Sequence, residues 1–413
     1  MSALIYLLTR PEPVTFDELS AELRPVLPLL GELPHTPQDP EWHAEGDVAT
    51  HSALVLARAH ELSEGLDPFD RAALLLAAAL HDIGKALTTR EEPEGSSGQI
   101  RLRSRQHARR GRDYLAYRLL DTGLAPRLIL TVLELVAHHH SLHRAAESEL
   151  GRGVFALARQ VPLPLLVRLA KADARGREVR GGDGRKGEDT ADYLELLARD
   201  LGVWNVTDPY AAFRAEIAAL LPGAPPELLA LAVGRGIQDW EAGVIHTPHE
   251  AVARVQEAAR SGFPRLTVLC GPSGSGKSTY AHSVPDADLI SLDALRAKLG
   301  KNASDQRVNG QVLQAAREQL REALRRGRHA VWDATTLRRS QRAQVLGLGY
   351  DYGALTELHV LWTPPGQLGA RISGRERQVN SAVLADQLRL LEFPEVGEAH
   401  RLTWDTLEGE LSG

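Results

Sequence analysis

The stretch LTVLCGPSGSGKST, residues 266–279, joins a run of apolar residues directly to a glycine-rich loop. Gly271, Gly276, Lys277 and Ser278 complete the spacing G-x-x-x-x-G-K-[ST], in which a buried strand leads into the loop and a helix follows it. Glycines let backbone N–H groups curl around phosphate oxygens, and the N-terminus of the helix adds a partial positive charge. The stretch therefore predicts an α/β domain that binds a nucleoside triphosphate.

The side chains of this loop have distinct expected roles. Lys277 would reach the β- and γ-phosphates, and the Ser278 hydroxyl would hold Mg²⁺, so the expected cofactors are Mg²⁺ and ATP or another nucleoside triphosphate. The residues expected to contact the nucleotide are Gly271, Ser273, Gly274, Ser275, Gly276, Lys277, Ser278 and Thr279. The loop by itself does not indicate what the phosphate is used for.

Two carboxylates follow apolar segments in the C-terminal half. The predicted strand LISL ends at Asp293, and the strand within HAVWDAT ends at Asp333. Since strand C-termini face the ligand crevice of an open α/β sheet, Asp293 could accept a proton from an attacking hydroxyl, and Arg296 could hold a neighbouring phosphate of the acceptor. Asp333 would hold Mg²⁺ or its waters, and Ala334 in place of a glutamate favours a kinase over an ATPase motor.

A basic segment follows the last predicted strand, ELHVLW, and carries Arg371, Arg375 and Arg377. A spacing of four places Arg371 and Arg375 on one helix face. Arginines over a phosphate-binding loop can stabilise the charge of phosphoryl transfer, so both are expected to contact the nucleotide. A solvent-facing basic helix is the alternative.

The N-terminal half is predicted to be helical. Between Asp47 and Lys171, apolar residues recur at i, i+3, i+4 and i+7, which indicates a helical domain of about 130 residues. The candidate metal ligands at its helix ends and on its apolar helices are His51, His81, Asp82, His107, His138 and Asp173. Imidazole and carboxylate bind transition-metal ions, and a bound metal lowers the pKa of its water. Each histidine alone is better explained by hydrogen bonding, but together the six predict one or two metal sites.

The choice of His138 is open, because His139 and His140 follow it directly. On a helix the three side chains point about 100° apart. Only one of them is therefore expected to share the face of the other ligands.

An arginine-dense run, RLRSRQHARRGRDY, surrounds His107. Its basic residues are Arg101, Arg103, Arg105, Arg109, Arg110 and Arg112, against the single acid Asp113. Because arginine suits phosphate recognition, the run favours a patch that holds a nucleic-acid backbone. A solvated charged face is the alternative.

The order H…HD…H…H…D, with AALHDIGK at its centre, resembles the HD-domain phosphohydrolases over about residues 44–177. It is nearest to the HD domains of bacterial tRNA nucleotidyltransferases, which process 2′,3′-cyclic and 2′-phosphate ends. The family's ligands fall on His51, His81, Asp82 and Asp173, with His107 and His138 available for a second metal. The resemblance implies hydrolysis of a phosphate ester with one or two divalent metals (Mn, Ni, Co or Zn). Asp82 would be catalytic, and Lys85 would contact phosphate, with a surface lysine as its alternative.

The C-terminal motifs resemble the phage-type 5′-OH polynucleotide kinases over about residues 265–392. The resemblance implies that Asp293 is the general base, that Arg296 grips the 3′-side phosphate of the terminal nucleotide, and that Arg375 is a lid arginine on the triphosphate. Lys277 belongs to the same catalytic set. One departure is Asn380, which stands where the family often has proline after the lid.

An HD phosphohydrolase in front of such a kinase is similar to the bacterial HD-domain/polynucleotide kinase family, which is bifunctional in nucleic-acid end healing. The similarity implies a kinase acting on 5′-OH ends of RNA or DNA, and a hydrolase that removes 2′-, 3′- or 2′,3′-cyclic phosphates. A ligase would act on the products. The alternatives are a small-molecule kinase fused to a nucleotide phosphohydrolase, and a non-catalytic P-loop switch with a nucleotide-sensing HD module.

The expected organisation is a multidomain chain: an all-α HD phosphohydrolase at residues 1–180, a linker and helical connector at 181–246, and an α/β P-loop kinase with a parallel sheet at 247–413. The net charge of −6 requires that any nucleic-acid binding come from local patches. The single cysteine, Cys270, fits a reducing cytoplasm, and no apolar run approaches the ~20 residues of a membrane span. We therefore expect a cytoplasmic protein without a membrane partner. A homodimer and the roles of residues 1–40 and 191–246 stay open.

Overall fold

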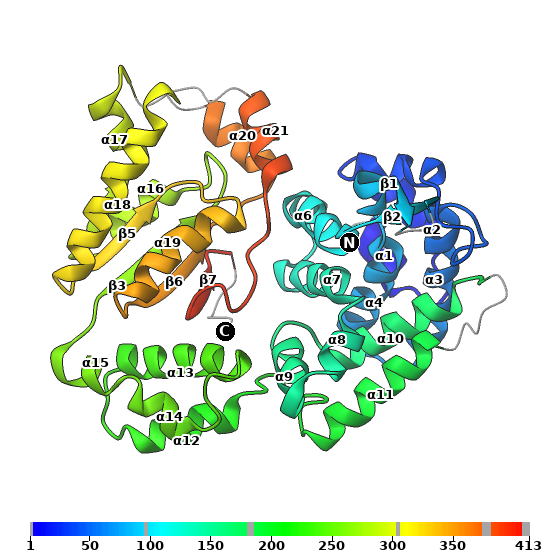
Figure 1. The fold of residues 1–413 in the computed structure, drawn as a ribbon. Coiled ribbons are helices and arrows are strands. Elements are labelled where there is room, and N and C mark those ends of the chain that lie inside the picture. The colour runs from blue at the N-terminus through cyan, green and yellow to red at the C-terminus, as the bar shows by residue number, and fades with distance from the viewer. Residues whose placement is uncertain (1–2, 95–97, 180–185, 303–305, 374–380, 407–413) are drawn as a thin grey trace. The chain divides into compact units, whose positions relative to one another are not determined.

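The computed structural model describes residues 3–94, 98–179, 186–302, 306–373 and 381–406. The chain divides into two compact units, Met1–Pro209 and Tyr210–Gly413 (Figure 1). This boundary falls inside the predicted connector, residues 181–246, so that α11 belongs to unit 1 while α12 and α13 belong to unit 2. The three-part division of the chain therefore stays a prediction.

Unit 1 is predominantly helical. Its α-helices are α1 (Ala3–Thr9), α2 (Phe16–Leu23), α3 (Val48–Leu62), α4 (Pro68–Leu80), α5 (Lys85–Thr88), α6 (His107–Arg118), α7 (Pro126–His138), α8 (Leu142–Ala146), α9 (Arg152–Ala158), α10 (Leu163–Arg175) and α11 (Lys186–Asp200). Its 3₁₀ turns are η1 (Pro28–Gly31), η2 (Leu33–His35), η3 (Leu119–Thr122) and η4 (Glu149–Gly151).

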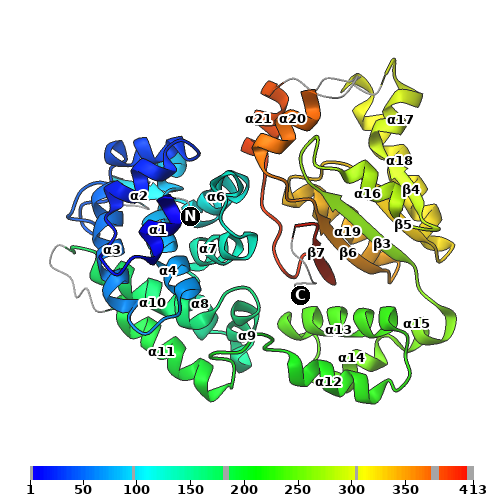
Figure 2. The ribbon, with the colours of Figure 1, turned by 180° about the vertical axis from the view of Figure 1, so that it is seen from behind.

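Helix α4 lies at the centre of unit 1, where it packs against α1, α3, α7 and α10 (Figures 1 and 2). Its residues from Ala72 to Leu80 are all apolar and all buried, as expected of a helix that is hydrophobic all round. The side chain of its N-cap, Asp67, accepts hydrogen bonds from two backbone N–H groups and fixes where the helix begins. The helix ends at Leu80 and so delivers His81 and Asp82 directly to the interior.

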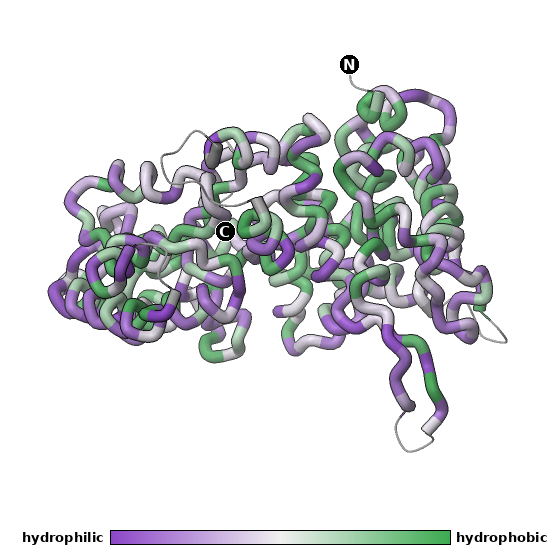
Figure 3. The backbone as a smooth tube through the Cα atoms, turned by 90° about the horizontal axis from the view of Figure 1, so that it is seen from above, coloured by the Kyte–Doolittle hydropathy of each residue, from purple (hydrophilic) through white to green (hydrophobic). Residues whose placement is uncertain are grey.

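A hairpin of β1 (Thr89–Glu94) and β2 (Gln99–Ser104) interrupts the helices of unit 1. The two antiparallel strands project from the helices and are largely hydrophilic (Figure 3). The sequence did not predict this hairpin, because TREEPE lacks the apolar alternation that marks a half-buried strand. The arginine run therefore begins in a strand whose partner strand is acidic.

Unit 2 is built around a parallel sheet. Its strands are β3 (Arg265–Cys270), β4 (Asp288–Ser291), β5 (His329–Asp333), β6 (Leu355–Val360) and β7 (Arg401–Trp404). Its helices are α12 (Ala211–Leu220), α13 (Pro226–Glu241), α14 (Pro248–Ala253), α15 (Gln256–Ser261), α16 (Lys277–Ser283), α17 (Leu292–Leu299), the 3₁₀ turn η5 (Gln306–Val308), α18 (Asn309–Arg325), α19 (Arg339–Asp351), α20 (Pro365–Ser373) and α21 (Ser381–Leu390).

Within the described residues the sheet has five strands in the order β4-β5-β3-β6-β7, and every neighbouring pair is parallel. Helix α18 packs on β4 and β5, while α19 packs on β3 and β6. Strand β3 lies at the centre and is buried from Leu266 to Cys270, which explains its unbroken apolar sequence. The predicted fold class, a helical N-terminal half and a C-terminal α/β domain with a parallel sheet, is confirmed.

The predicted end of the strand LISL is wrong by two residues. Strand β4 ends at Ser291, whose side chain accepts a hydrogen bond from the backbone N–H of Ala294 and thereby caps α17. Asp293 consequently lies in the first turn of α17, rather than at the end of the strand.

The second half of the predicted connector packs onto the sheet of unit 2. Buried residues of α12, α13 and α14, among them Ile217, Leu231 and Ala251, form one apolar cluster with Leu355 of β6. None of the described helices is long and apolar enough to cross a membrane alone. One pair, Glu149–Ala158 with Leu163–Arg175, meets the criterion by length and composition only when it is joined across a 92° bend.

A fully buried arginine joins the loop after β5 to the segment before β7. The guanidinium of Arg342 binds both carboxylate oxygens of Glu398 at 2.7 and 2.9 Å. It also donates to the carbonyls of Thr336 and Leu337 at 3.2 and 3.0 Å. This arrangement satisfies a charge that is 0% exposed, because its partners replace the water that the guanidinium lost.

Replacement of Arg342 by alanine is expected to lower the free energy of unfolding of unit 2 by about 3–5 kcal/mol, since it leaves the Glu398 carboxylate buried and unpaired. Denaturation of the full chain, followed by tryptophan fluorescence, measures the loss. The control is Arg389→Ala, which removes an exposed pair with Asp386 and should cost at most about 1 kcal/mol. Equal losses in the two variants would contradict this role of Arg342.

Candidate active sites

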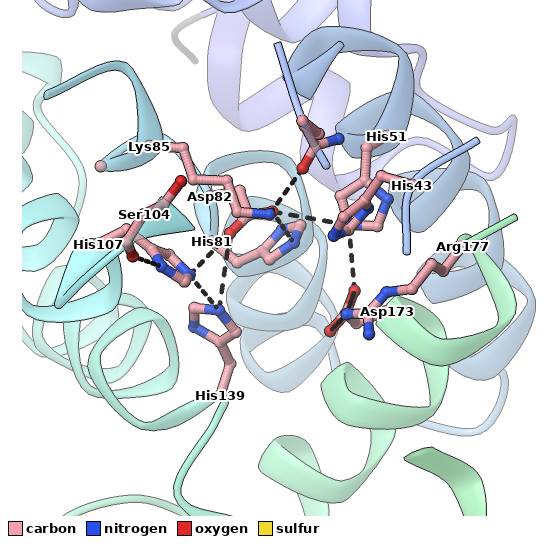
Figure 4. A network of polar contacts seen from close by, with 12 residues as sticks. His43, His51, His81, Asp82, Lys85, Ser104, His107, His139, Asp173 and Arg177 are labelled. Atoms are coloured by element: carbon pink, nitrogen blue, oxygen red, sulfur yellow. Dashed lines mark hydrogen bonds and ion pairs between the residues drawn. The ribbon is translucent and has the colours of Figure 1, made fainter. Parts of the chain in front are cut away.

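Five helices of unit 1 bring histidine and aspartate side chains to one place (Figure 4). They are supplied by α3, the turn after α4, the start of α6, the turn after α7, and α10. The residues concerned are His51, His81, Asp82, His107, His139, His140 and Asp173. Five of the six ligands that the sequence predicted are therefore gathered here, although they span more than a hundred residues of sequence.

The Asp82 carboxylate lies at the centre and faces two groups of imidazoles. Its Oδ1 is 3.0 Å from Nε2 of His107 and 3.8 Å from Nε2 of His139. Its Oδ2 is 3.3 Å from Nε2 of His81 and 3.7 Å from Nε2 of His51. Each carboxylate oxygen of Asp82 thus faces a different pair of imidazole nitrogens.

We name the two sets by their members. Set A is His51, His81 and Asp173, and set B is Asp82, His107, His139 and His140. Within each set the ligand atoms lie within 4.8 Å of one another. In set A, Nε2 of His51 is 3.1 Å from Oδ1 of Asp173.

Backbone carbonyls orient three of the imidazole rings. The Nδ1 atom of His81 lies 2.9 Å from the carbonyl of Ala78, and Nδ1 of His107 lies 2.7 Å from that of Ser104. The ring of His139 makes the same kind of contact, at 2.7 Å, with a carbonyl of α7. Because a carbonyl can only accept, each Nδ1 carries a proton, and each Nε2 is the ring nitrogen that a metal at the centre could bind.

The residues present fit a divalent metal. Within the part of the chain that the structure describes, the buried Nε2 of His81 and Oδ1 of Asp82 make no aligned hydrogen bond, although His107 and Asp82 lie within ion-pair distance of them. Buried polar atoms of this kind are costly unless a ligand engages them. Imidazole nitrogens and carboxylate oxygens together suit a divalent transition metal, and which of the predicted metals binds stays a prediction.

The electrostatics of the group hold Asp82 ionised. Burial opposes its charged form, but Lys85 and the neighbouring His81 keep the pKa of this carboxyl well below its ordinary value. For His51, burial likewise opposes the charge, yet contacts with Asp173 and Glu45 raise its pKa to about 9. In contrast, burial and the nearby His140 lower the pKa of His139 well below its ordinary value, so that this ring is neutral, as a metal ligand must be.

His138 is not part of the group. Its Nε2 lies 3.4 Å from the Glu134 carboxylate, and its Nδ1 lies 3.3 Å from the Ser141 hydroxyl. The expectation that only one of the three consecutive histidines can share the face is also wrong. Helix α7 ends at His138, so the 100° spacing does not continue, and the following turn brings both His139 and His140 inward.

Lys85 is not a surface residue. It is 8% exposed, and its Nζ lies 2.7 Å from Oδ2 of Asp82 and donates to Oε1 of Gln38 at 2.6 Å. Gln38 lies in the N-terminal segment in which the sequence showed no chemistry. Gly84, between Asp82 and Lys85, allows a close approach to α6, because a Cβ there would lie 2.0 Å from the carbonyl oxygen of His107.

Sequence reasoning missed further residues around the group. Arg177 binds both oxygens of Asp173 at 3.0 and 2.9 Å, and its position one helical turn later was a usable signal. His43 and Glu45 lie beside His51, with His43 and His51 ring centroids 4.7 Å apart. Nothing in the local sequence distinguishes these two residues from an ordinary polar loop.

The arginine run around His107 is not the uncompensated basic surface that the sequence suggested. Its ion pairs join Arg101 to Asp39, Glu41 and Glu94, Arg103 to Glu94, Arg105 to Glu92, and Arg112 to Asp113. The acids come mainly from β1 and from the loop at residues 39–41. The charge of the run is therefore neutralised locally to a large extent.

In unit 2, the phosphate-binding loop connects β3 to α16 as predicted. Gly274 and Gly276 have φ of +86° and +103°, which are backbone angles that residues other than glycine rarely adopt. Nζ of Lys277 donates to the carbonyl of Pro272 at 2.7 Å, so the ammonium group lies within the loop where a phosphate would bind. The buried Ser275 and the exposed Thr279 complete the loop and the first turn of α16.

The predicted Mg²⁺ residues lie together. The Ser278 hydroxyl donates to Oδ2 of Asp333 at 3.0 Å, because β5 lies beside β3 in the sheet. A hydroxyl and a carboxylate in contact suit a hard cation that prefers oxygen ligands.

The predicted acceptor residues also contact one another. Nη1 of Arg296 donates to Oδ1 of Asp293 at 2.6 Å, and its Nε donates to Asn309 at 3.1 Å. Strand β4 pairs with β5, with Ser291 level with Asp333, so Asp293 lies just beyond the edge of the sheet where the Mg²⁺ residues lie. Its side chain is 63% exposed, so that a substrate hydroxyl can reach it.

The arginine-bearing segment is only partly described. Arg371 lies on α20 and is exposed, while Arg375 and Arg377 lie outside the described residues. The following helix, α21, contributes a residue that the sequence did not reveal. Gln387 accepts a hydrogen bond from the backbone N–H of Ser273 at 2.8 Å and donates to the Ser273 hydroxyl at 3.0 Å.

Replacement of His139 by alanine is expected to weaken binding of Mn²⁺ to the chelator-stripped chain by at least about tenfold, because an inward-facing Nε2 is lost. Replacement of His138 should leave the affinity close to that of the unsubstituted protein. Calorimetric titration measures both. The reverse order of effects would restore His138 as the ligand.

Comparison with known proteins assigns a domain family to each half of the chain. Residues 48–177 match the HD domain family, and residues 266–394 match an AAA domain family. The chain therefore carries an HD hydrolase domain followed by a P-loop kinase-like domain, and both are typical of enzymes. HD domains bind divalent metals, and P-loop kinases use a nucleotide with Mg²⁺.

Curated relatives share the HD architecture. A multifunctional CCA protein of Alkalilimnicola ehrlichii is 33% identical over 175 residues, which are 40% of this chain and 39% of the relative. One of Hahella chejuensis is 31% identical over 179 residues, 42% of this chain and 38% of the relative. One of Pasteurella multocida is 34% identical over 134 residues, 32% and 29% of the two chains. The chain thus spans about two fifths of the length of the first two relatives, or less.

Proposed function

We propose that the protein is a bifunctional enzyme that heals nucleic-acid ends. Its kinase transfers the γ-phosphate of a nucleoside triphosphate to a 5′-OH end. Its HD domain removes a 2′-, 3′- or 2′,3′-cyclic phosphate. The resulting 5′-phosphate and 3′-OH are the ends that a ligase joins, which makes the two activities complementary.

The observation that carries the proposal is the placement of the exposed Asp293 carboxylate beyond the edge of the sheet that holds Ser278 and Asp333. A carboxylate at this position can take the proton of an attacking hydroxyl, as phosphoryl transfer to an alcohol requires. Arg296 holds this carboxylate and is itself held by Asn309, which limits its rotamers. A nucleotide-driven motor would have no use for such an acceptor group.

The chemistry of the HD site follows from its donor atoms. Sets A and B, which meet at Asp82, would hold one or two divalent metals. A divalent metal held there would supply Lewis-acid chemistry for the hydrolysis of a phosphate ester. Lys85 keeps Asp82 ionised and lies beside the place where a phosphate would bind. Arg177 fixes the orientation of Asp173 through two hydrogen bonds.

A nucleic-acid end as substrate is supported by the kind of relatives that the chain has. The printed name of these relatives, multifunctional CCA protein, agrees with the resemblance of the sequence to the HD domains of tRNA nucleotidyltransferases. One observation favours the alternative, a small-molecule kinase fused to a nucleotide phosphohydrolase. At least four of the six arginines in the run around His107 are paired with acids, and the net charge of the chain is −6, which weakens the attraction for a long polyanion.

Two variants separate the activities. Asp293→Asn should lower phosphorylation of a 5′-OH oligonucleotide by about 10²–10⁴-fold, because the general base is lost. Asp82→Asn should abolish dephosphorylation of a 2′,3′-cyclic phosphate end. Labelled ATP with Mg²⁺ measures the first reaction, and gel mobility of the second oligonucleotide with Mn²⁺, Ni²⁺ or Co²⁺ measures the other.

Each variant is the control for the other, since each should keep the activity that it does not target. Phosphorylation of mononucleosides but not of oligonucleotides would establish the small-molecule alternative. If the protein modified neither oligonucleotides nor mononucleosides, both the end-healing proposal and the small-molecule alternative would be contradicted.

A further inference from the structure

Glu45 is a buried carboxylate next to the HD site that no motif identifies. It lies in the loop before α3, and its side chain is 1% exposed. Its Oε1 is 2.8 Å from Nδ1 of His51 and 2.8 Å from Nδ1 of His43. Among the described residues, this ion-pair contact is the one given for the buried Nδ1 of His51, which makes no aligned hydrogen bond.

This contact orients the His51 ring and keeps a proton on its Nδ1. An ionised carboxylate can only accept, so Nδ1 of His51 is protonated and Nε2 is turned toward Asp173 and Asp82. In His81, His107 and His139, the Nδ1 atom instead contacts a neutral backbone carbonyl. Within the described part of the site, His51 is therefore the imidazole oriented by a carboxylate. Such a partner makes the ring more basic than a ring oriented by a carbonyl, and so a stronger metal ligand.

The same carboxylate ties together the two ends of set A. Its Oε2 accepts a hydrogen bond from the backbone N–H of Glu178 at 3.1 Å, and the neighbouring Ala44 N–H donates to the Glu178 carbonyl at 2.7 Å. Glu178 follows α10, the helix that carries Asp173. Glu45 thus connects the entry to α3, which carries His51, with the exit of α10.

A direct role of Glu45 as a ligand is less consistent with these contacts. A metal bound among His43, Glu45 and His51 would need Nδ1 of His51, and the same ring already directs Nε2 at Asp173. The Oε1 atom is also occupied by contacts with both imidazoles. An outer position fits the geometry better.

We propose that Glu45 is a positioning residue that orients His51 and thereby tightens divalent metal binding at set A, while leaving set B unaffected. This inference rests on the proposed metal-dependent hydrolase. The inference goes beyond the proposed hydrolase, because it assigns a residue outside the ligand sets to the support of set A. Asp82 of set B also contacts set A, but it does so through Nε2 atoms, whereas Glu45 contacts the Nδ1 side of His51.

The test is calorimetric titration of the full-length, chelator-stripped chain with Mn²⁺. Glu45→Ala should weaken the binding event of set A by about 10–100-fold, the effect typical of losing an outer-shell partner, and leave the other event unchanged. Glu45→Gln keeps an oxygen that can accept from His51 and should recover most of the affinity. Glu41→Ala is the matched control and should bind like the unsubstituted protein, because Glu41 lies on the same loop as Glu45 but its carboxylate pairs with Arg101 of β2.

The variants also separate positioning from loss of folding. The apo forms of Glu45→Ala and Glu41→Ala should keep the kinase activity of unit 2 and the far-ultraviolet circular dichroism of the unsubstituted chain. Unchanged Mn²⁺ affinity in Glu45→Ala, or equal losses in Glu45→Ala and Glu45→Gln, would overturn the proposal. Loss of one whole equivalent of Mn²⁺ in Glu45→Gln would show instead that Glu45 is itself a ligand.

This readout needs no phosphorylated substrate, so it does not depend on whether that substrate is a nucleic acid. If the titration succeeds and no oligonucleotide is dephosphorylated, only the substrate in the proposed function fails. If the unsubstituted chain binds no divalent metal, the hydrolase and the role of Glu45 both fail.

Discussion

The buried carboxylate of Asp82 is the constraint on which the arrangement of unit 1 depends. Removing an ionised carboxylate from water costs several kcal/mol, and the cost must be offset by charged or hydrogen-bonding partners. Lys85 supplies one of them, and others are the adjacent His81 and imidazoles from α3, α6 and the turn after α7. The apolar helix α4 makes this possible, because its complete burial carries the carboxylate to the middle of the unit.

In unit 2, the candidate phosphate site is formed mainly by backbone groups. The loop after β3 offers N–H groups and a helix N-terminus, and the parallel order of β4, β5 and β3 brings the ends of three strands to one edge. Side chains that act on the phosphate then need only to follow those strands. This is why Ser278, Asp333 and Asp293 lie near one another although they are separate in sequence.

The sequence predicted the parts of both sites that depend on fixed local spacing. The glycine loop, the strand ending at Asp333 and the helix ending in His81 and Asp82 are of this kind, since the geometry of a turn or a helix end is local. It did not predict which consecutive histidine points inward, because that depends on where α7 ends. Nor did it reveal Gln38 or Gln387, which reach their partners across long stretches of chain. Glu45 contacts the nearby His51, but it also binds the distant backbone of Glu178, and no local motif marks it.

The central claim is that the two oxygens of Asp82 serve two metal-binding sets, and anomalous diffraction tests it most directly. Crystals of the chelator-stripped protein, soaked in Mn²⁺ and measured at the manganese edge, would locate the ions. The account predicts two peaks flanking Asp82, one among His51, His81 and Asp173 and the other among His107, His139 and His140. A peak bound by His138, or no peak beside either oxygen of Asp82, would contradict it.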